Sequence, residues 1–349
     1  MAYTNIDDPS AYFQAFTYSG TSNTAASYTF TGNSNMKPDL VWLKQKGYSE
    51  SHVLFDSSRG VEKGIYSNLT NAEANINSSL TSFDTNGFSV GVSNVGSGGG
   101  TYATWNFKAN GGTTSSNTDG NTTTTVQANQ DAGFSIVTYT GTGSSSQTMG
   151  HGLGVTPNIV LTKSRSAAYN WSVNGNVGGL IYGTNRLTMN TTAALTADTN
   201  EVTAASSTTF TGGGSINVNY NTVTYVAYCF VEKQGYSKFG KYVGNASADG
   251  TFVYTGFKPA WVMIKGADVV DDWYIFDNKR AGYNPEVFRL RANTADAEVT
   301  GTNNTVDLLS NGFKLRFTGG SINGSGSTYI YMAFAENPFV AGGIPTTAR

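Results

Sequence analysis

The chain has 349 residues, of which only 13% are charged, and its formal net charge is −2. This balance argues against binding to nucleic-acid phosphates, because such binding needs a basic patch and the lysines and arginines here are scattered singly. No apolar run reaches the roughly 18 residues of a membrane span, and the first residues lack the basic start and apolar core of a signal peptide. We therefore expect a protein made in the cytoplasm, without membrane insertion and without nucleic acid as a partner.

Strand signals dominate from the first residues onward. Runs of Tyr, Phe, Val, Ile and Thr alternate with Gly, Asn, Ser and Asp, and no stretch sustains the periodicity of an amphipathic helix. In the first 110 residues this pattern predicts eight short strands, at residues 12–18, 27–31, 39–44, 52–56, 64–68, 80–83, 88–92 and 102–107. Such a density of strands is typical of a β-sandwich or jelly roll.

Two phrases of the sequence occur three times each. The first reads KPDLVWLK at residues 37–44, TPNIVLTK at 156–163 and KPAWVMIK at 258–265. The second reads TYATWNF at 101–107, TYVAYCF at 224–230 and TYIYMAF at 328–334. Internal repetition at this spacing indicates tandem copies of one module. The predicted fold is therefore all-β with little helix, in three tandem antiparallel β-sandwich repeats of jelly-roll type, each of about 100 residues.

The first phrase predicts a strand that is apolar on both faces. Leu40 and Trp42 fall on one side of it, and Val41 and Leu43 fall on the other. A strand of this kind is covered above and below, so we expect it at the centre of its sheet.

The spacing of the phrases gives the predicted domain organisation. Repeat 1 with an N-terminal attachment segment covers 1–110, repeat 2 covers 133–235, and repeat 3 covers 236–338. The intervening segment 111–132 is rich in Gly, Thr, Ser and Asn, with almost no apolar residue, which is typical of a linker. The last residues, 339–349, are punctuated by Pro and Gly and are expected to be an extended tail.

Charged residues recur at the end of the first phrase and in the turn after the next predicted strand. The set comprises three lysines and two Asp–Arg pairs: Lys44, Lys163, Lys265, Asp56 with Arg59, and Asp277 with Arg280. Such a group either binds an anion or a sugar, or holds turns and salt bridges. We interpret all seven as structural, because an Asp in a turn most often bonds to nearby backbone. Repeat 2 has Asn174 and Gly175 and no Arg at this place.

Four aromatic residues lie beside polar loops that follow the first phrase. They are Tyr169 and Trp171 in repeat 2, and Trp273 and Tyr274 in repeat 3. Aromatic rings on a surface offer a stacking platform for sugars. The alternative is that they cover the edges of strands. We take these four as the candidate ligand-binding residues.

The search for catalytic and metal-binding motifs is negative. The only histidines are His52 and His151, and no nucleophile elbow, phosphate loop or zinc-protease motif is present. The single cysteine, Cys229, lies in an apolar run and rules out an intrachain disulfide. The sequence thus predicts no enzyme activity, no metal site and no cofactor.

Longer phrases stand at residues 6–13, 38–44, 55–60, 134–143, 151–154 and 329–339. These stretches resemble a family of repeat-containing virion structural and tail-fibre-like proteins of marine tailed phages of the cyanophage type. The resemblance implies lectin-like β-sandwich modules and membership of the particle. It brings no catalytic motif, and the missing Arg of repeat 2 leaves open whether that repeat binds anything.

The resemblance leads to a prediction of a non-enzymatic virion surface protein in a tail fibre or appendage. Its partners would be other virion proteins of the tail or capsid and a host surface glycan, held by weak multivalent contacts. The alternatives are a capsid decoration protein on the head and a carbohydrate-active depolymerase. A homotrimer is compatible with either placement, and nothing in the sequence specifies one.

Overall fold

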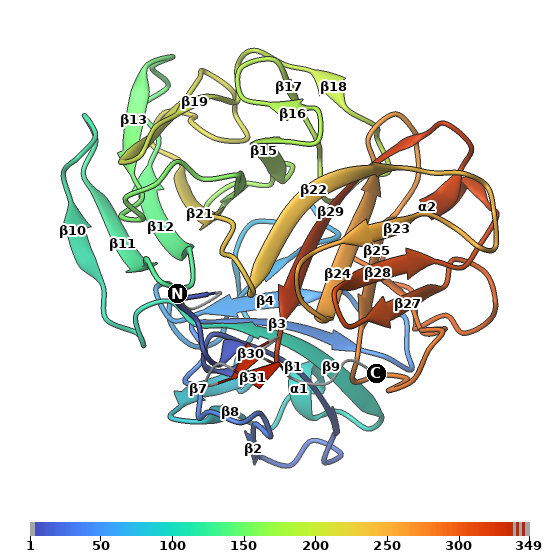
Figure 1. Cartoon of the computed structure of the whole chain (residues 1–349). Coiled ribbons are helices and arrows are strands. Elements are labelled where there is room, and N and C mark those ends of the chain that lie inside the picture. The colour runs from blue at the N-terminus through green and yellow to red at the C-terminus, as the bar shows by residue number, and fades with distance from the viewer. Residues whose placement is uncertain (1–3, 338–339, 342–343, 346–349) are drawn as a thin grey trace.

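The computed structural model describes residues 4–337, 340–341 and 344–345. These residues are built mostly from antiparallel strands, with helical turns at η1 (Pro9–Ala11), α1 (Asn94–Ser97) and α2 (Gly320–Asn323). The strands form three sandwich-like units, which lie around a common centre (Figure 1). We name them unit 1 (residues 4–109), unit 2 (110–232) and unit 3 (233–337). The expectation of an all-β protein with little helix is confirmed.

Unit 1 pairs a six-stranded sheet, in the order β1-β9-β3-β4-β5-β6, with a three-stranded sheet, β2-β8-β7. The bounds are β1 (Phe13–Ser19), β2 (Ala26–Thr29), β3 (Leu40–Gln45), β4 (Val53–Asp56), β5 (Lys63–Tyr66), β6 (Ala74–Asn75), β7 (Leu80–Asp84), β8 (Gly87–Val90) and β9 (Thr101–Phe107). The eight strands predicted for this part of the chain agree with β1–β5 and β7–β9 to within two residues at each end.

Unit 2 has a seven-stranded sheet, β10-β11-β12-β21-β14-β15-β16, a three-stranded sheet, β13-β20-β19, and the pair β17-β18. The bounds are β10 (Ser115–Asn117), β11 (Thr124–Asn129), β12 (Phe134–Thr140), β13 (Gln147–Gly150), β14 (Ile159–Ser164), β15 (Ser172–Val177), β16 (Leu180–Ile181), β17 (Asn185–Arg186), β18 (Thr196–Ala197), β19 (Val202–Ala205), β20 (Thr209–Gly212) and β21 (Thr224–Phe230).

Unit 3 has a five-stranded sheet, β22-β29-β24-β25-β26, and a three-stranded sheet, β23-β28-β27. The bounds are β22 (Ser237–Val243), β23 (Phe252–Tyr254), β24 (Pro259–Gly266), β25 (Trp273–Asp277), β26 (Leu290–Arg291), β27 (Val306–Leu309), β28 (Gly312–Leu315) and β29 (Thr328–Ala335). The short strands β30 (Val340–Ala341) and β31 (Ile344–Pro345) follow, and the other residues of the expected tail lie outside the described part of the chain.

The segment 111–132 is not the free linker that its composition suggested. It supplies β10 and β11, and β11 pairs along β12 so that the segment extends the large sheet of unit 2. The first part of the segment lacks apolar residues because β10 lies at the edge of the sheet, where much of its surface meets solvent. β11 lies inside the sheet, between β10 and β12, and the side chain of Val126 on it is buried in the core of unit 2.

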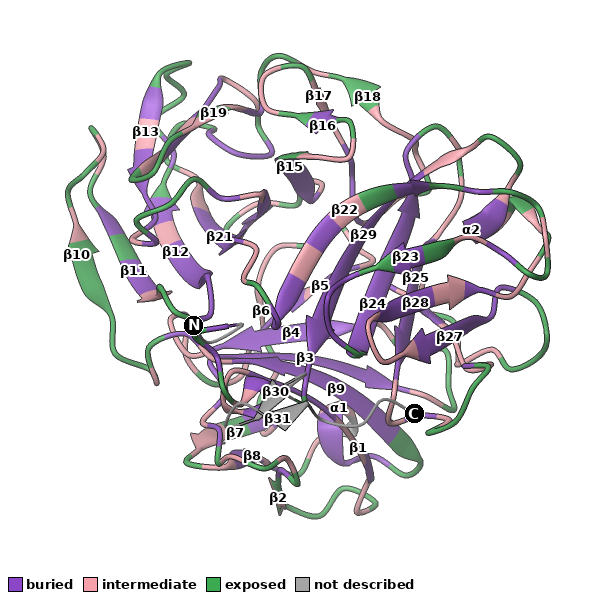
Figure 2. Ribbon diagram, viewed as in Figure 1, coloured by how far each residue is buried: buried purple, intermediate pink, exposed green. Residues whose placement is uncertain are grey.

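Each large sheet is buried on both faces, as the first phrase predicted for its own strand. In unit 1, Val41 and Phe55 face the small sheet of the same unit and share a core with Phe88. Leu40 and Trp42, on the opposite face, join a second core that also contains residues of units 2 and 3. The strands that meet at the centre of the molecule are accordingly buried along their length (Figure 2).

Three phenylalanines, one from each unit, meet at this centre. Phe107, Phe230 and Phe334 are each the last residue of a TY…F phrase. Their ring centroids lie 5.9 Å apart for the first two, 5.1 Å for Phe107 and Phe334, and 5.9 Å for the last two. Aromatic pairs at such distances add to the stability gained from burying their area alone. The three units thus share one core instead of sitting beside one another as independent domains.

We predict that Phe107→Ala lowers the free energy of unfolding by about 3–5 kcal/mol, because it removes a buried ring and leaves a cavity among three units. Chemical unfolding followed by tryptophan fluorescence measures the loss. The control is Phe252→Ala, whose ring on β23 is 44% exposed, and it should change stability much less. An equal loss in both variants would contradict the central role of Phe107.

Candidate functional site

The two Asp–Arg pairs predicted from the sequence form the same buried turn. In unit 1, Asp56 Oδ1 accepts from the backbone N–H of Arg59 at 2.9 Å, and Asp56 Oδ2 pairs with the Arg59 guanidinium. Arg59 also donates to the carbonyl of Leu54 at 2.9 Å. Both side chains are fully buried, so the guanidinium can stay charged there only because carboxylates and carbonyls surround it.

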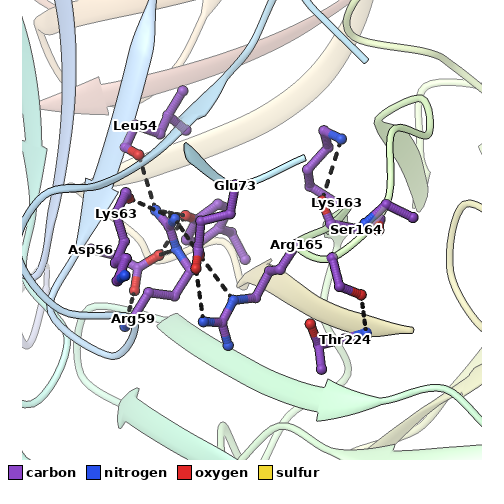
Figure 3. A network of polar contacts seen from close by, with 12 residues as sticks. Leu54, Asp56, Arg59, Lys63, Glu73, Lys163, Ser164, Arg165 and Thr224 are labelled. Atoms are coloured by element: carbon purple, nitrogen blue, oxygen red, sulfur yellow. Dashed lines mark hydrogen bonds and ion pairs between the residues drawn. The ribbon is translucent and has the colours of Figure 1, made fainter. Parts of the chain in front are cut away.

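This turn also binds unit 2 across what we call junction 1–2. The hydroxyl of Tyr228 on β21 donates to Asp56 Oδ2 at 2.7 Å. Glu73 lies between two arginines, 3.0 Å from Arg59 Nη1 and 3.0 Å from Arg165 Nε of unit 2 (Figure 3). Burial would raise the pKa of Glu73, but the two guanidinium groups outweigh it and the pKa is lowered. The carboxylate is therefore held charged between the units.

Junction 3–1, between units 3 and 1, is built in the same way. Asp277 Oδ2 accepts from Arg280 Nε at 2.6 Å and from the indole N–H of Trp105, on β9 of unit 1, at 3.0 Å. Glu298 accepts from Arg280 Nη1 at 3.0 Å, and its own backbone N–H donates to the carbonyl of Lys46 at 2.7 Å. Trp105 and Tyr228 occupy the same place in their TY…F phrases, and Glu298 plays the part of Glu73.

Junction 2–3, between units 2 and 3, has the same backbone hydrogen bond as the other junctions but no Asp–Arg pair. The backbone N–H of Leu195 donates to the carbonyl of Ala267 at 2.8 Å, as Glu73 does to Arg165 in junction 1–2, also at 2.8 Å. The register of β14 and β15 puts Gly175 where unit 1 has Asp56, and a Cβ there would lie 2.4 Å from the carbonyl oxygen of Asn158.

The residues of unit 3 that face unit 2 at this junction also differ from their counterparts at the other junctions. In the TY…F phrase of unit 3, Met332 stands where unit 2 has Tyr228, and Met332 has no group that donates a hydrogen bond. Met332 and Ala267 lie in the shared core, against which Leu195 packs. At the place of the Asp–Arg turn, both sides of this junction therefore present residues without charged side chains, while the other two junctions have a buried ion pair there.

The three lysines of the first phrases have one geometry in common. Each donates to a backbone carbonyl of its own loop and to one of a neighbouring unit. The contacts to the neighbours are Lys44 Nζ to Ala295 O at 3.0 Å, Lys163 Nζ to Thr70 O at 2.9 Å, and Lys265 Nζ to Thr192 O at 3.1 Å. Burial lowers the pKa of each lysine to about 8. The lysines therefore hold the junctions, and their charge is not presented to solvent.

The four candidate sugar-stacking aromatics do not form an exposed platform. Trp171 and Trp273 are 0% and 4% exposed, and Tyr274 is buried as well. The indole N–H of Trp171 donates to Tyr66 O in unit 1 at 2.8 Å, and that of Trp273 donates to Thr188 O in unit 2 at 3.2 Å. Tyr169 is half-buried, and its carbonyl accepts from Lys163. The expectation of surface rings was wrong for the two tryptophans because loops of the neighbouring unit cover them.

The sequence reasoning did not find Glu73, Glu298, Arg165 or Tyr228. Glu73 and Glu298 lie well beyond the Asp–Arg turn in irregular segments, and no recurring phrase marks them. A signal was available for Tyr228, because it and Trp105 stand at one position of a repeated phrase and both can donate a hydrogen bond. Which carboxylate accepts that bond is decided only when the units pack together.

Within the described residues, no group of three or more His, Cys, Asp or Glu side chains is placed to hold a metal ion. In the same part of the chain, no helix is long and apolar enough to cross a bilayer. Cys229 is buried with a free thiol, and burial raises its pKa to about 12.

Comparison with known proteins places the chain in one family. A model described as "Domain of unknown function (DUF7483)" matches residues 8–338, so the chain belongs to that family over nearly its whole length. No curated protein and no solved structure matches the chain.

We predict that Asp56→Ala and Asp277→Ala each lower the free energy of unfolding by about 3 kcal/mol, because each leaves a buried arginine without its nearest carboxylate. Thermal and urea unfolding measure the effect. Asp249→Ala is the control, since Asp249 pairs with Lys314 and Arg316 at an exposed position and its loss should leave the melting temperature almost unchanged. Wild-type melting in both junction variants would overturn the structural interpretation of the Asp–Arg pairs.

We also predict that stability increases between about pH 8 and pH 9. The lysine pKa values fall from 10.5 to about 8 on folding, so in this range the unfolded chain binds more protons than the folded chain. The free energy of unfolding then rises with pH. Near pH 10 the buried tyrosines oppose the rise, because burial raises their pKa values and they ionise first in the unfolded chain. Lys163→Met should reduce the slope, whereas Lys241→Met, at an exposed position, controls for the loss of one positive charge. A slope equal to that of the wild type in Lys163→Met would contradict this prediction.

Proposed function

We propose that this member of the DUF7483 family is a non-enzymatic structural protein on the exterior of a tailed-phage particle. It would belong to a tail fibre or appendage and contact host glycans weakly at several places. The observation that carries the proposal is the use made of the recurring polar residues. The Asp–Arg pairs and the lysines form hydrogen bonds with neighbouring units, and these bonds join the three units into one block.

Strand order and the contacts at the junctions both bear on how the three units are related. We propose that the three units are copies of one lectin-like sandwich of the jelly-roll type. In support, the central strands of the large sheets have one order: β1-β9-β3-β4, β12-β21-β14-β15 and β22-β29-β24-β25. The small sheets also correspond, as β2-β8-β7, β13-β20-β19 and β23-β28-β27. One backbone hydrogen bond recurs at all three junctions, which is expected when copies of a module pack by one rule.

A block of this kind suits the outside of a particle. Its two Asp–Arg clusters are buried at junctions, and the chain has few charged residues but many Ser, Thr, Asn and Gly residues. Buried and fully bonded arginines resist separation of the units, because removal from their carboxylates would leave a bare charge in an apolar setting. Multivalent weak contacts to a host surface need just such a rigid support.

The alternative proposal is a decoration protein on the head. The cyclic arrangement is compatible with it, because unit 1 binds unit 2 through Asp56, unit 2 meets unit 3 at Leu195, and unit 3 binds unit 1 through Asp277. Three similar faces around one centre match a threefold position on a shell, and they equally match a trimeric fibre.

Copy number separates the two placements. We expect quantitative mass spectrometry of purified particles to find this chain at a small multiple of the tail symmetry, as for an appendage component. Hundreds of copies per particle would favour the head. Absence of the chain from purified particles would refute both forms of the proposal.

A further inference from the structure

Unit 3 contains a polar hollow that the junctions do not use. Its volume is about 210 Å³, and its wall includes Asn278 and Glu286 from the segment after β25, Lys258 before β24, and the ring of Tyr283. The hollow lies beside the Asp277–Arg280 turn, since Asn278 directly follows Asp277. Lys258 and Tyr283 are exposed, and Tyr283 is 64% accessible to solvent.

Two acceptors in the wall of this hollow have no partner among the described residues. Glu286 is only 1% exposed, and its Oε1 accepts no hydrogen bond. Asn278 Oδ1 is also buried and unpaired, although the Asn278 amide nitrogen lies 3.4 Å from Glu336. Buried polar atoms in folded proteins almost always have partners, because an unpaired one costs about 1–3 kcal/mol. Two of them on residues that line one hollow make it the candidate ligand site of unit 3.

The matching place in unit 1 is already filled by a polar group of the chain itself. Ser57 corresponds to Asn278, since each donates its backbone N–H at 2.9 Å to the carbonyl of the residue that directly follows the proline of the first phrase. The amide nitrogen of Gln127 on β11 donates to the hydroxyls of Ser57 and Ser58, at 2.9 and 2.7 Å. A hydrogen-bonding group thus occupies in unit 1 the place that is open in unit 3.

The chemistry of the wall selects the kind of ligand. Burial raises the pKa of Glu286 to about 8, with Arg280 opposing the shift, so the carboxyl group is largely neutral at neutral pH. A neutral carboxyl both donates and accepts, and a hydroxyl group matches it in either protonation state. A ring with several hydroxyls offers donors both to the carboxyl of Glu286 and to the amide oxygen of Asn278. An exposed tyrosine ring at the rim can pack against the C–H face of the same ring.

We propose that this hollow binds a single sugar ring, with its hydroxyls on Glu286 and Asn278 and its C–H face on Tyr283. The inference rests on the glycan contact in the proposed function and gives that contact a place in unit 3. Lys258 at the rim donates to a ring or hydroxyl oxygen. Because the site holds a single ring, it binds weakly, and strength comes from several copies of the chain engaging a glycan surface together.

Saturation-transfer NMR with free galactose, glucose, mannose and N-acetylglucosamine at millimolar concentration tests the site on the full-length protein. We expect at least one of these sugars to bind, and Glu286→Leu and Tyr283→Ala to weaken that binding at least about tenfold. Glu286→Leu should fold, because an apolar side chain of similar size replaces a buried carboxyl whose Oε1 has no hydrogen-bond partner. Tyr283→Ala changes an exposed ring and provides a second variant that tests binding independently of folding. Tyr48→Ala, an exposed tyrosine in unit 1, is the matched control and should bind as the wild type does.

Three outcomes overturn the inference. In the first, none of the four sugars binds the wild-type protein. In the second, binding persists unchanged in both Glu286→Leu and Tyr283→Ala. In the third, Tyr48→Ala loses binding while Tyr283→Ala retains it, because the site would then lie in unit 1. None of these results bears on the copy number of the chain in particles. A failure of the sugar site is therefore distinct from a failure of the proposed placement.

Discussion

Burial of one face of every large sheet against the other two units is the constraint on which the molecule depends. Each sheet has two apolar faces, and its small partner sheet covers only one of them. A unit on its own would expose the other apolar face of its large sheet, including the ring of Phe107 or its counterparts. The hydrophobic gain on closing three such faces together is proportional to the apolar area removed from water. Closure of the ring of three units therefore follows from the pattern within each strand.

Closure also buries charged side chains, and these can remain charged only where oppositely charged and hydrogen-bonding groups surround them. Arg59 and Arg280 are fully buried, and each is surrounded by a carboxylate of its own turn, a second carboxylate and backbone carbonyls. Such arrangements stabilise less than their distances suggest, because both charges have lost their water. Their value lies in selectivity: a unit that docks in another register leaves a buried charge unpaired. We regard the polar junctions as the part of the molecule that fixes which faces meet.

At junction 2–3 the Asp–Arg pair on one side and the hydrogen-bond donor that would face it on the other are both replaced. Gly175 and Leu195 in unit 2 face a neighbour that offers Met332 and Ala267, so neither side strands a charge or a donor. A change on one side alone would be costly, since it would leave a polar group of the partner without its bond. The lysine contact survives here, with Lys265 bound to Thr192 O. Hence the three junctions differ in their side chains while their backbone geometry is shared.

The sequence by itself determined the strands of unit 1, the apolar character of both faces of β3, and the recurrence of the phrases whose lysines, aspartates and arginines lie at the junctions. These features depend on local pattern, which the alternation of side chains along a strand makes visible. The tertiary structure alone decided what covers the outer face, that Trp171 and Trp273 are buried, and that Glu73 and Glu298 complete the clusters. Each of those outcomes depends on a contact between residues far apart in the chain, and a tryptophan beside a polar loop has the same sequence signature whether solvent or a neighbouring unit lies over it.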